Sequence, residues 1–201
     1  MNAYYQVNLK DFIDELGEED VKPILFSFSS PFNQDIETFL REKAIEFSRQ
    51  RLAATYLVFT KFKDNLELVG YYTLSNKTID IFKKNLSSKL RGRIKKFAEY
   101  NDALKKYTLS AILIAQLGKN YTNDFDKLIT GDELLKMACD RVNEIQIMLS
   151  GKVVYLECEN VPRLQKFYME NGFSYFGERG LDPDESSQFK TKSLIQMLKY
   201  L

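Results

Sequence analysis

The spacing of hydrophobic residues differs from one segment of the chain to the next, and each spacing predicts a strand or a helix. Apolar runs at residues 109–118 and 153–158 predict two buried strands. Between them, apolar residues recur every three or four positions from Leu134 to Leu149, which is the spacing of an amphipathic helix. Residues 162–172 predict another helix, and Gly172 suits its C-terminus. A strand, loop, helix, strand and helix in this order form the edge of a parallel sheet that can hold a phosphate-bearing cofactor.

The N-terminal quarter predicts smaller elements. We expect a strand at residues 4–8, a helical turn at residues 10–16 that Gly17 ends, and a loop or irregular strand at residues 24–31. The clearest helix is predicted at residues 33–51, where Asn33 is a suitable cap and the apolar positions form one stripe.

Two runs rich in β-branched and aromatic residues, 55–62 and 66–74, flank a polar turn and predict a β-hairpin. Gly70 in the second run indicates a bulge or a close approach by another group. Near the C-terminus, residues 173–177 and 193–201 predict two strands with a loop at residues 180–187 between them. The last strand could pair within the domain or across a dimer, and the sequence leaves both open.

Residues 83–106 differ in composition from the rest of the chain. They contain nine Lys and Arg residues against two acidic residues, a net charge of +7 in a chain whose net charge is +1. Leu86, Leu90, Ile94 and Phe97 repeat at helical spacing, which predicts a basic amphipathic helix inserted before the central strand. Such a helix can contact the phosphates of a nucleic acid or a cofactor, or it can present a solvated basic face.

Composition narrows the class of protein. The length of 201 residues suits a single domain over residues 1–201. We expect a cytoplasmic protein without a membrane partner, because no apolar run is long enough for a span and the N-terminus does not resemble a signal peptide. Two cysteines, Cys139 and Cys158, are too few for a disulfide scaffold. The absence of histidine excludes Ser-His-Asp and Cys-His sites, and no metal is expected.

Three short segments carry candidate chemistry. At the strand end, residues 115–119, Gly118 would let an extended ligand lie beside the backbone. Residues 130–133 fit a capping box at a helix N-terminus, where free amides attract phosphate, although Asp132 and Glu133 oppose an anion. The third segment is the aromatic pair Phe167-Tyr168 near the end of the last predicted helix, which alone is ordinary core material.

Together, these segments resemble the GNAT superfamily of acetyl-CoA-dependent N-acetyltransferases. The family signature A-x-x-F-Y-x-x-x-G-F is similar to residues 164–173, LQKFYMENGF. The family's strand ending A-R-L-A-V-D resembles residues 115–120, AQLGKN, and its helix start L-G-x-x-L-L resembles residues 130–135, TGDELL. The resemblance implies an α/β fold with a mixed central sheet of about six to seven strands, helices on both faces and the basic helical insertion at residues 83–106.

The N-terminal half resembles one branch of the superfamily, which contains toxins of toxin–antitoxin modules that acetylate aminoacyl-tRNA. Residues 31–44, 55–59 and 68–74 are similar to that branch in order and spacing. The acceptor stays open between a small amine, a protein N-terminus and the amino group of an aminoacyl-tRNA. An α-amine, partly neutral at pH 7, needs less help to react than a lysine side chain does. Contact with tRNA would fall to five cations of the basic segment: Lys89, Arg91, Arg93, Lys95 and Lys96.

The resemblance also implies roles for individual residues. Tyr168 matches the tyrosine that protonates the departing CoA thiolate, and ordinary pKa values of about 10 for a phenol and about 8.5 for a thiol permit that transfer. The residues expected to contact acetyl-CoA fall into three groups: Leu117, Gly118 and Lys119 for the pantetheine arm, Lys127, Thr130, Gly131 and Asp132 for the pyrophosphate, and Asn160.

The identity of the general base is open, and three departures from the family pattern leave open whether the protein is an enzyme. Without histidine, deprotonation falls to a carboxylate, a tyrosine or water, and Glu157 is a candidate base, with a strand-end salt bridge as the alternative. One glycine of the phosphate loop is missing, Gln116 replaces an arginine, and Asn160 lies one residue farther from Tyr168 than is usual. A non-catalytic binding or regulatory module with the same fold is therefore the alternative to an enzyme.

Overall fold

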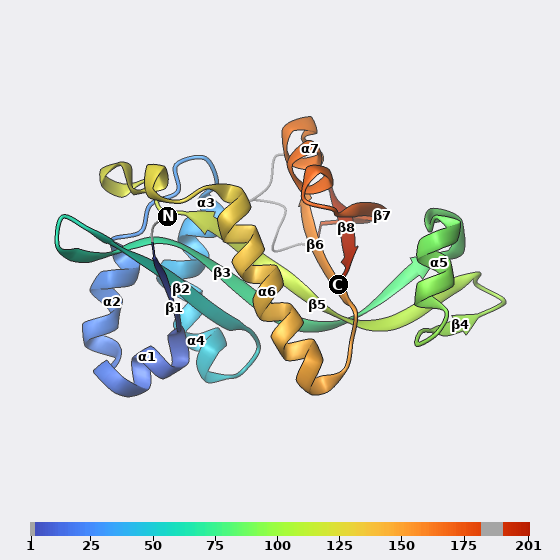
Figure 1. Cartoon of the computed structure of the whole chain (residues 1–201), viewed down its shortest axis with the longest axis horizontal. Helices are drawn as coiled ribbons and strands as arrows, with labels where there is room; N and C mark the ends of the chain where they lie inside the picture. Colours follow the sequence, from blue (N-terminus) through green and yellow to red (C-terminus); the bar gives the residue numbers. More distant parts are fainter. Residues whose placement is uncertain (1–2, 182–190) are drawn as a thin grey trace. The chain divides into compact units, whose positions relative to one another are not determined.

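The chain divides into two compact units, and three long elements, labelled in Figure 1, each contribute residues to both. They are β3 (Asn65–Phe82), β5 (Lys106–Lys119) and α6 (Gly131–Leu149). The first unit takes residues up to 75 and 115–138, and the second takes residues 76–114 and 139–201. This computed structural model describes residues 3–181 and 191–201. Its strands are hydrogen-bonded in the order β1-β2-β3-β5-β6-β8-β7, with β4 beside β5. The predicted mixed α/β fold is confirmed, and the sheet has one strand more than the expected six to seven.

The strands of the first unit form the predicted hairpin and its neighbour. β1 (Tyr4–Asn8) pairs antiparallel with β2 (Ala54–Phe62), and β2 pairs antiparallel with β3. Lys63 and Asp64 connect β2 to β3 with positive φ angles of 48° and 66°, the conformation of a tight two-residue hairpin turn. The register shifts opposite Gly70, which confirms the bulge that this glycine indicated. β3 continues eight residues beyond its predicted end.

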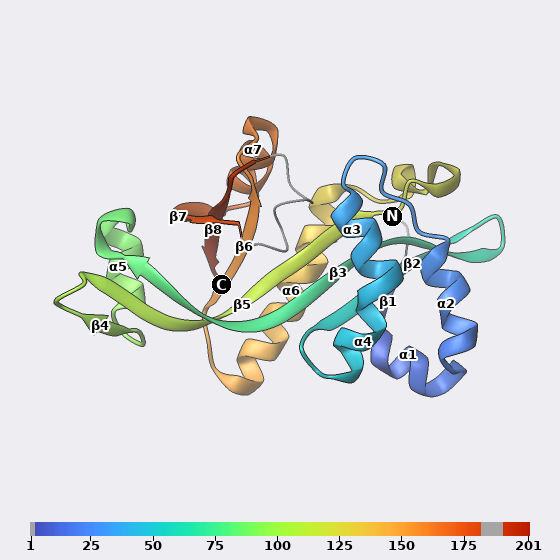
Figure 2. The same ribbon diagram turned by 180° about the vertical axis from the view of Figure 1, so that it is seen from behind.

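Four α-helices and one π-helical turn follow β1 and precede β2 in the first unit (Figure 2). α1 (Leu9–Leu16) ends at Gly17, as predicted. The prediction of a loop or irregular strand at residues 24–31 is wrong at its start, because α2 (Glu18–Phe26) continues through Pro23. Val21 and Leu25 are both fully buried one helical turn apart, and this burial outweighs the cost of a proline inside the helix.

The helix predicted at residues 33–51 is present with a local irregularity. Asn33 caps α3 (Gln34–Thr38) by accepting hydrogen bonds from the amides of Asp35 and Ile36. A π-helical turn, Phe39–Lys43, then leads into α4 (Ala44–Arg49). The apolar stripe of this helix joins the core of the first unit, whose largest fully buried side chains include Leu9, Leu25, Phe28, Leu40, Leu57 and Tyr71.

The second unit contains the parallel pair and the C-terminal strands. β5 pairs in parallel with β6 (Val153–Glu159) through Ile112–Ile114 and Val154–Leu156. β8 (Ser193–Tyr200) lies antiparallel between β6 and β7 (Ser174–Gly180), so the last strand pairs within its own chain. α7 (Pro162–Glu170) connects β6 to β7. Most of the loop predicted at residues 180–187 lies outside the described residues.

The basic segment is only partly helical, so the prediction of one helix over residues 83–106 is wrong in extent. α5 covers Ser88–Ile94, and β4 (Glu99–Asn101) pairs antiparallel with the start of β5. Leu86 and Ile94 are buried against Ile79, Ile81 and Tyr107, whereas Phe97 is exposed. The segment therefore forms a short helix and a β-hairpin next to β3 and β5. Beyond Ile94 the apolar repeat is not buried in the core, so strand pairing forms there and the helix does not continue.

Among the described residues, no helix combines the length and the apolar character that crossing a bilayer requires.

Candidate active site

The predicted pantetheine segment lies at the end of β5, where the backbone is tightly surrounded. A Cβ atom added to Gly118 would overlap Cγ2 of Ile36 and lie 3.3 Å from the ring of Phe28. On β3, a Cβ atom added to Gly70 would lie only 2.9 Å from the carbonyl oxygen of Gly118. Gly70 is therefore required by a close backbone approach, as the sequence indicated, and Gly118 is required by close side-chain packing. Gly118 is fixed from two sides by α3 and β3.

Asn120, which the sequence analysis did not identify, fixes the chain just after this strand end. Its buried side chain accepts hydrogen bonds from the amides of Ser29 (2.9 Å) and Thr122 (3.1 Å) and donates to the carbonyl of Leu68 (2.8 Å). Its own amide donates to the carbonyl of Val69 at 2.9 Å. One buried amide side chain thus joins β3, β5 and two loops, and no pattern in the sequence distinguishes it from a turn asparagine.

The side chain of Lys119 braces the loop between β5 and α6. Its Nζ atom donates to the backbone carbonyls of Asp126 (2.8 Å) and Ile129 (3.3 Å). The hydroxyl of Tyr4 donates to the carbonyl of Leu128 at 2.9 Å. These contacts hold residues 126–129 in place immediately before Thr130. The sequence analysis expected only the backbone of Lys119 to have a role, and it did not predict this role of the side chain.

Thr130 and Glu133 form the predicted capping box at the start of α6. The Glu133 amide donates to Thr130 Oγ1 at 3.1 Å, while Glu133 Oε2 accepts from both the amide and the hydroxyl of Thr130 at 2.8 Å. These hydrogen bonds from Thr130 lower the pKa of the Glu133 carboxyl below its usual value. The Thr130 amide is consequently occupied, which leaves Gly131, the first residue of α6, as the better placed of the two for a phosphate contact.

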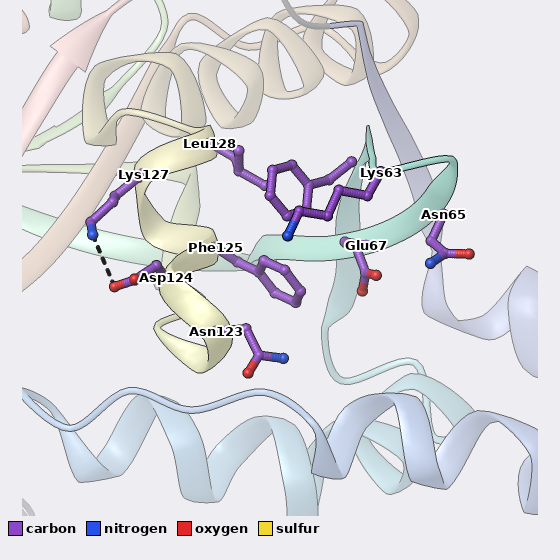
Figure 3. Close-up of a pocket in the computed structure, with 9 residues that line it drawn as sticks. Lys63, Asn65, Glu67, Asn123, Asp124, Phe125, Lys127 and Leu128 are labelled. Atoms are coloured by element: carbon purple, nitrogen blue, oxygen red, sulfur yellow. Dashed lines mark ion pairs between the residues drawn. The ribbon is translucent and has the colours of Figure 1, made fainter.

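Lys127 belongs to a pocket of about 600 Å³ between the β2–β3 turn and the segment Thr122–Leu128 (Figure 3). The rings of Phe62 and Phe125 meet edge to face there, with centroids 6.1 Å apart. Lys127 pairs with Asp124 at 3.1 Å, and both side chains are largely exposed. Lys127, one of the residues predicted to contact acetyl-CoA, therefore shares a pocket with residues of the β2–β3 hairpin. The sequence analysis did not predict that contact. The lining residues are Phe62, Lys63, Asn65, Glu67, Asn123, Asp124, Phe125, Lys127 and Leu128.

Gln116, at a position where the resemblance to the toxin branch implied an arginine, contacts a carboxylate. Its Nε2 atom donates to Oδ2 of Asp35, on the first turn of α3, at 2.9 Å. Tyr71 on β3 supports the same turn, because its hydroxyl donates to the carbonyl of Ile36 at 2.6 Å. Burial, and then the charge of Asp35, raise the pKa of Tyr71 well above its usual value, so this phenol stays neutral. Asp35 and Gln116 are 81 positions apart in the chain, and the sequence analysis missed their pairing.

In the second unit, Tyr168 lies on α7 between two aromatic rings. The ring of Phe167 lies 5.0 Å from it and the ring of Phe173 lies 5.9 Å from it, both edge to face. Burial raises the pKa of Tyr168, and Cys158 adds to the increase. Burial likewise raises the pKa of Cys158 to about 11. Tyr168 is therefore a neutral hydroxyl donor, and its pKa lies farther from that of a thiol than the sequence-based comparison assumed.

Glu157 forms the salt bridge that the sequence analysis gave as the alternative to a base. Its Oε2 accepts from Nε of Arg179 at 2.6 Å, and its Oε1 accepts from Nε2 of Gln196 at 2.9 Å. Gly177 makes room for this arrangement, because a Cβ atom there would lie 2.9 Å from Oε1 of Gln196. Asn160, at the start of the connection to α7, is exposed and accepts a hydrogen bond from Gln165 at 2.7 Å. Both oxygens of Glu157 are thus already occupied.

Comparison with known proteins identifies the fold. Neither a protein-family model nor a curated protein sequence matches this chain. Among solved structures, AtaT complexed with acetyl-methionyl-tRNAfMet matches with a TM-score of 0.63 at 16% identity, over 96% of this chain and 94% of that one. A tyrosine-to-phenylalanine mutant of KacT matches with a TM-score of 0.61 at 14% identity, over 96% and 93%. AtaTR bound with AcCoA matches with a TM-score of 0.54 at 15% identity, over 96% and 91%.

These identities establish a likeness of fold and nothing finer. The chain has the fold of the AtaT and KacT structures, so the fold that the resemblance predicted is confirmed. The assignments of catalytic and cofactor-binding residues stay predictions.

Proposed function

We propose that this chain is an acetyl-CoA-dependent N-acetyltransferase that transfers an acetyl group to a primary amine by direct attack within a ternary complex. The observation that carries the proposal is the likeness of fold over nearly the whole chain to AtaT, whose structures include one with acetyl-methionyl-tRNAfMet and one, of AtaTR, with AcCoA. Gly118 supports it in one respect: it lies at the strand end that the resemblance assigns to the pantetheine arm, and its packing against Ile36 and Phe28 holds that backbone in one conformation.

Several residues of the first unit are suited to contact acetyl-CoA, the proposed acetyl donor. Leu117, Gly118 and Lys119 would offer backbone groups to the pantetheine arm, and Lys127 and Gly131 would face the pyrophosphate with a cation and a helix N-terminus. The braces on the loop before Thr130 would hold that segment in one conformation and so lower the entropic cost of binding. Acetyl-CoA itself supplies an acyl group that is activated as a thioester.

Tyr168 is the proposed donor to the departing sulfur. Its raised pKa keeps the phenol protonated at neutral pH, so the hydroxyl is available for donation to a developing thiolate. A complete proton transfer is less favourable than between an ordinary phenol and a thiol. The first contribution of Tyr168 is therefore a hydrogen bond to the thiolate, and protonation of the sulfur completes the step.

The acceptor that we favour among primary amines is the amino group of an aminoacyl-tRNA. The observation behind this choice is the exposed charge of α5 and the turn that follows it. Within the described part of the chain, Lys89, Arg91, Lys95 and Lys96 form no ion pair, and Arg93 lies over the ring of Tyr200 at 4.8 Å. Cations without intramolecular partners are available to phosphates and release counterions on binding. Small amines and protein N-termini are the alternative acceptors.

The first experiment measures acetyl-CoA binding by calorimetry and then CoA release with and without aminoacylated bulk tRNA. We expect binding, together with release that depends on the charged tRNA. Tyr168→Phe should lower the turnover number by a factor on the order of 100, while Tyr175→Phe, which alters an exposed phenol, should leave it unchanged. The absence of acetyl-CoA binding at millimolar concentration would contradict the proposal. Release with small amines alone would retain the acetyltransferase and reject tRNA as the acceptor.

A second candidate function is a non-catalytic module with this fold. The observation that favours it is the occupied amide of Thr130 together with the negative charges of Asp132 and Glu133 at the start of α6. Such a module would bind tRNA without releasing CoA from acetyl-CoA. The same calorimetric experiment distinguishes the two functions.

A further inference from the structure

Two partly buried carboxylates in this molecule differ in how many of their oxygens are occupied. Glu157 has one oxygen bonded to Arg179 and the other bonded to Gln196. Asp35 has Oδ2 bonded to Gln116 and forms no ion pair with any residue in the described ranges 3–181 and 191–201. We infer that Asp35, positioned by Gln116, is the catalytic base that receives the proton of the acceptor amine. This inference rests on the proposed acetyltransferase function.

The backbone around Asp35 is fixed against the end of β5. The Asp35 amide donates to Oδ1 of the cap residue Asn33 at 3.1 Å. The next residue, Ile36, presses on Gly118, and its carbonyl accepts the hydroxyl of Tyr71. A carboxylate on this turn is thus held beside the strand end that would carry the thioester, as a base requires.

Gln116 fixes the orientation of the Asp35 side chain. The amide of Gln116 is an uncharged donor, so its bond to Oδ2 orients the carboxylate without forming an ion pair with it. Oδ1 has no hydrogen-bond partner among the described residues and is left to accept from a substrate N–H. Because Gln116 directly precedes Leu117 in β5, the same strand segment would position both the donor and the base. This explains why an uncharged residue occupies position 116, since an arginine there would pair with Asp35 and weaken it as a base.

The charges near Asp35 leave it available. On β3, Tyr71 is buried and neutral at ordinary pH. On the helix that Asp35 begins, the guanidinium of Arg41 is held by Glu37 and by the carbonyl of Phe28, to which it donates at 2.6 and 3.0 Å. Arg41 therefore makes no ion pair with Asp35. Neither Tyr71 nor Arg41 therefore competes with a substrate amine for Oδ1.

The chemical step is balanced with the groups present. The amine nitrogen attacks the thioester carbonyl carbon, and the new N–C bond makes that nitrogen acidic. Oδ1 of Asp35 takes the N–H proton, the C–S bond breaks, and the thiolate leaves as the thiol with a proton from Tyr168. Exchange with water then returns one proton to Tyr168 and removes one from Asp35. An α-amine is partly neutral before attack, so the carboxylate has only to accept the proton that becomes acidic once the N–C bond forms.

The test compares Asp35→Asn with Glu42→Gln in the full-length protein, with methionine methyl ester and aminoacylated bulk tRNA as acceptors. Glu42 is an exposed residue of the same helical segment, so its substitution controls for the lost charge. We expect Asp35→Asn to lower the turnover number by a factor on the order of 100, with acetyl-CoA affinity and melting temperature unchanged. Glu42→Gln should match the parent protein in all three measurements.

Two further measurements separate catalysis from structure. Formate should restore part of the activity of Asp35→Ala, because a small carboxylate can occupy the vacated space, whereas a structural defect would not respond. Gln116→Ala should lose about tenfold in turnover through misplacement of the base, and it should lose nothing further in the Asp35→Asn background.

The outcomes distinguish this inference from the proposed function. If the parent protein binds acetyl-CoA and acetylates an amine while Asp35→Asn retains its turnover, Asp35 is not the base and the acetyltransferase stands. If Asp35→Asn is inactive but formate does not rescue Asp35→Ala, the role is structural and the inference is overturned. If the parent protein binds no acetyl-CoA, the proposed function itself fails.

Discussion

The two ends of β5 are built on opposite physical principles. At its C-terminal end, in the first unit, glycines in close contact and buried hydrogen bonds fix each backbone group. At its N-terminal end, in the second unit, the strand pairs with a short hairpin strand whose neighbourhood carries a net charge of +7 on mostly exposed side chains. The first arrangement suits a ligand that must be held in one geometry, and the second suits a polyanion attracted over a distance.

Substitutions at the two ends of β5 should change different properties, stability at one end and polyanion affinity at the other. The buried side-chain amide of Asn120 serves three backbone partners and cannot be replaced without leaving those groups unsatisfied. The cations near α5 have aromatic rings, carboxylates or solvent as neighbours. Lys83 lies over Tyr100 at 5.5 Å, and Lys106 lies over Phe82 at 4.6 Å and pairs with Asp80 at 3.7 Å. We therefore expect stability to depend on the C-terminal end of β5 and polyanion affinity to depend on the region around its N-terminal end.

The largest effect on stability is expected from Asn120→Ala. The substitution leaves the amides of Ser29 and Thr122 and the carbonyl of Leu68 without their side-chain partner, which should cost about 3 kcal/mol of unfolding free energy. Asn143→Ala, on an exposed face of α6, should change it by less than about 0.5 kcal/mol. Urea denaturation of both variants measures the difference, and equal midpoints would contradict the structural role of Asn120.

A pair of glycine substitutions tests the same contrast with one chemical change. Gly118→Ala brings a methyl group against Ile36 and should destabilise the protein by about 2 kcal/mol. Gly92→Ala, inside α5 with no atom within 4 Å of the new Cβ, should stabilise it by about 0.5–1 kcal/mol through helix propensity. Thermal unfolding should therefore shift in opposite directions. A shift in the same direction would mean that the close approach at Gly118 relaxes freely.

Elements set by neighbouring residues could be predicted from the sequence. The β2–β3 hairpin follows from its polar turn, and the cap at Asn33 and the capping box at Thr130 involve residues only two or three positions apart. Tertiary burial decided the exceptions. Residues 24–31 suggested a loop or irregular strand where α2 continues to Phe26, and a helical repeat near Phe97 suggested a helix where strand pairing prevails.

The candidate site was less predictable because its contacts join distant parts of the chain. Gly118 was recognised as a position for close approach, but Ile36 as its neighbour was not. The bond between Asp35 and Gln116, like the bond between Asn120 and Leu68 52 positions away, has no local signature. The substitution of an arginine by Gln116 was visible in the sequence, and only the structure gives it a physical reason.

The basic end of β5 should respond in affinity and not in stability. Lys95→Ala with Lys96→Ala should weaken tRNA binding by about tenfold at low salt, or about 1.4 kcal/mol. The slope of log affinity against log salt should decrease by about 1.5. Lys43→Ala with Lys61→Ala removes the same charge from exposed positions of the first unit and should have a smaller effect on both. Filter binding at several salt concentrations measures this, and equal losses would attribute the attraction to net charge alone.

The smallest effect is expected at the capping box, and it depends on pH. Thr130→Ala removes the hydroxyl that bonds both the Glu133 amide and its carboxylate, which should cost about 1 kcal/mol at pH 7. Glu133 has a folded-state pKa below its usual value of 4.5, so the stability contributed by its carboxylate is present above that usual value and is lost as pH falls through the lowered pKa. The difference between the parent protein and Thr130→Ala should therefore shrink on acidification. Glu133→Gln keeps a side-chain acceptor but carries no charge. Its unfolding free energy should be lower than that of the parent at pH 7, and this difference should also shrink as Glu133 becomes protonated in the parent. Chemical denaturation at pH 7 and near pH 4 measures both, and a gap that stays constant would mean that the charge of Glu133 contributes nothing to the cap.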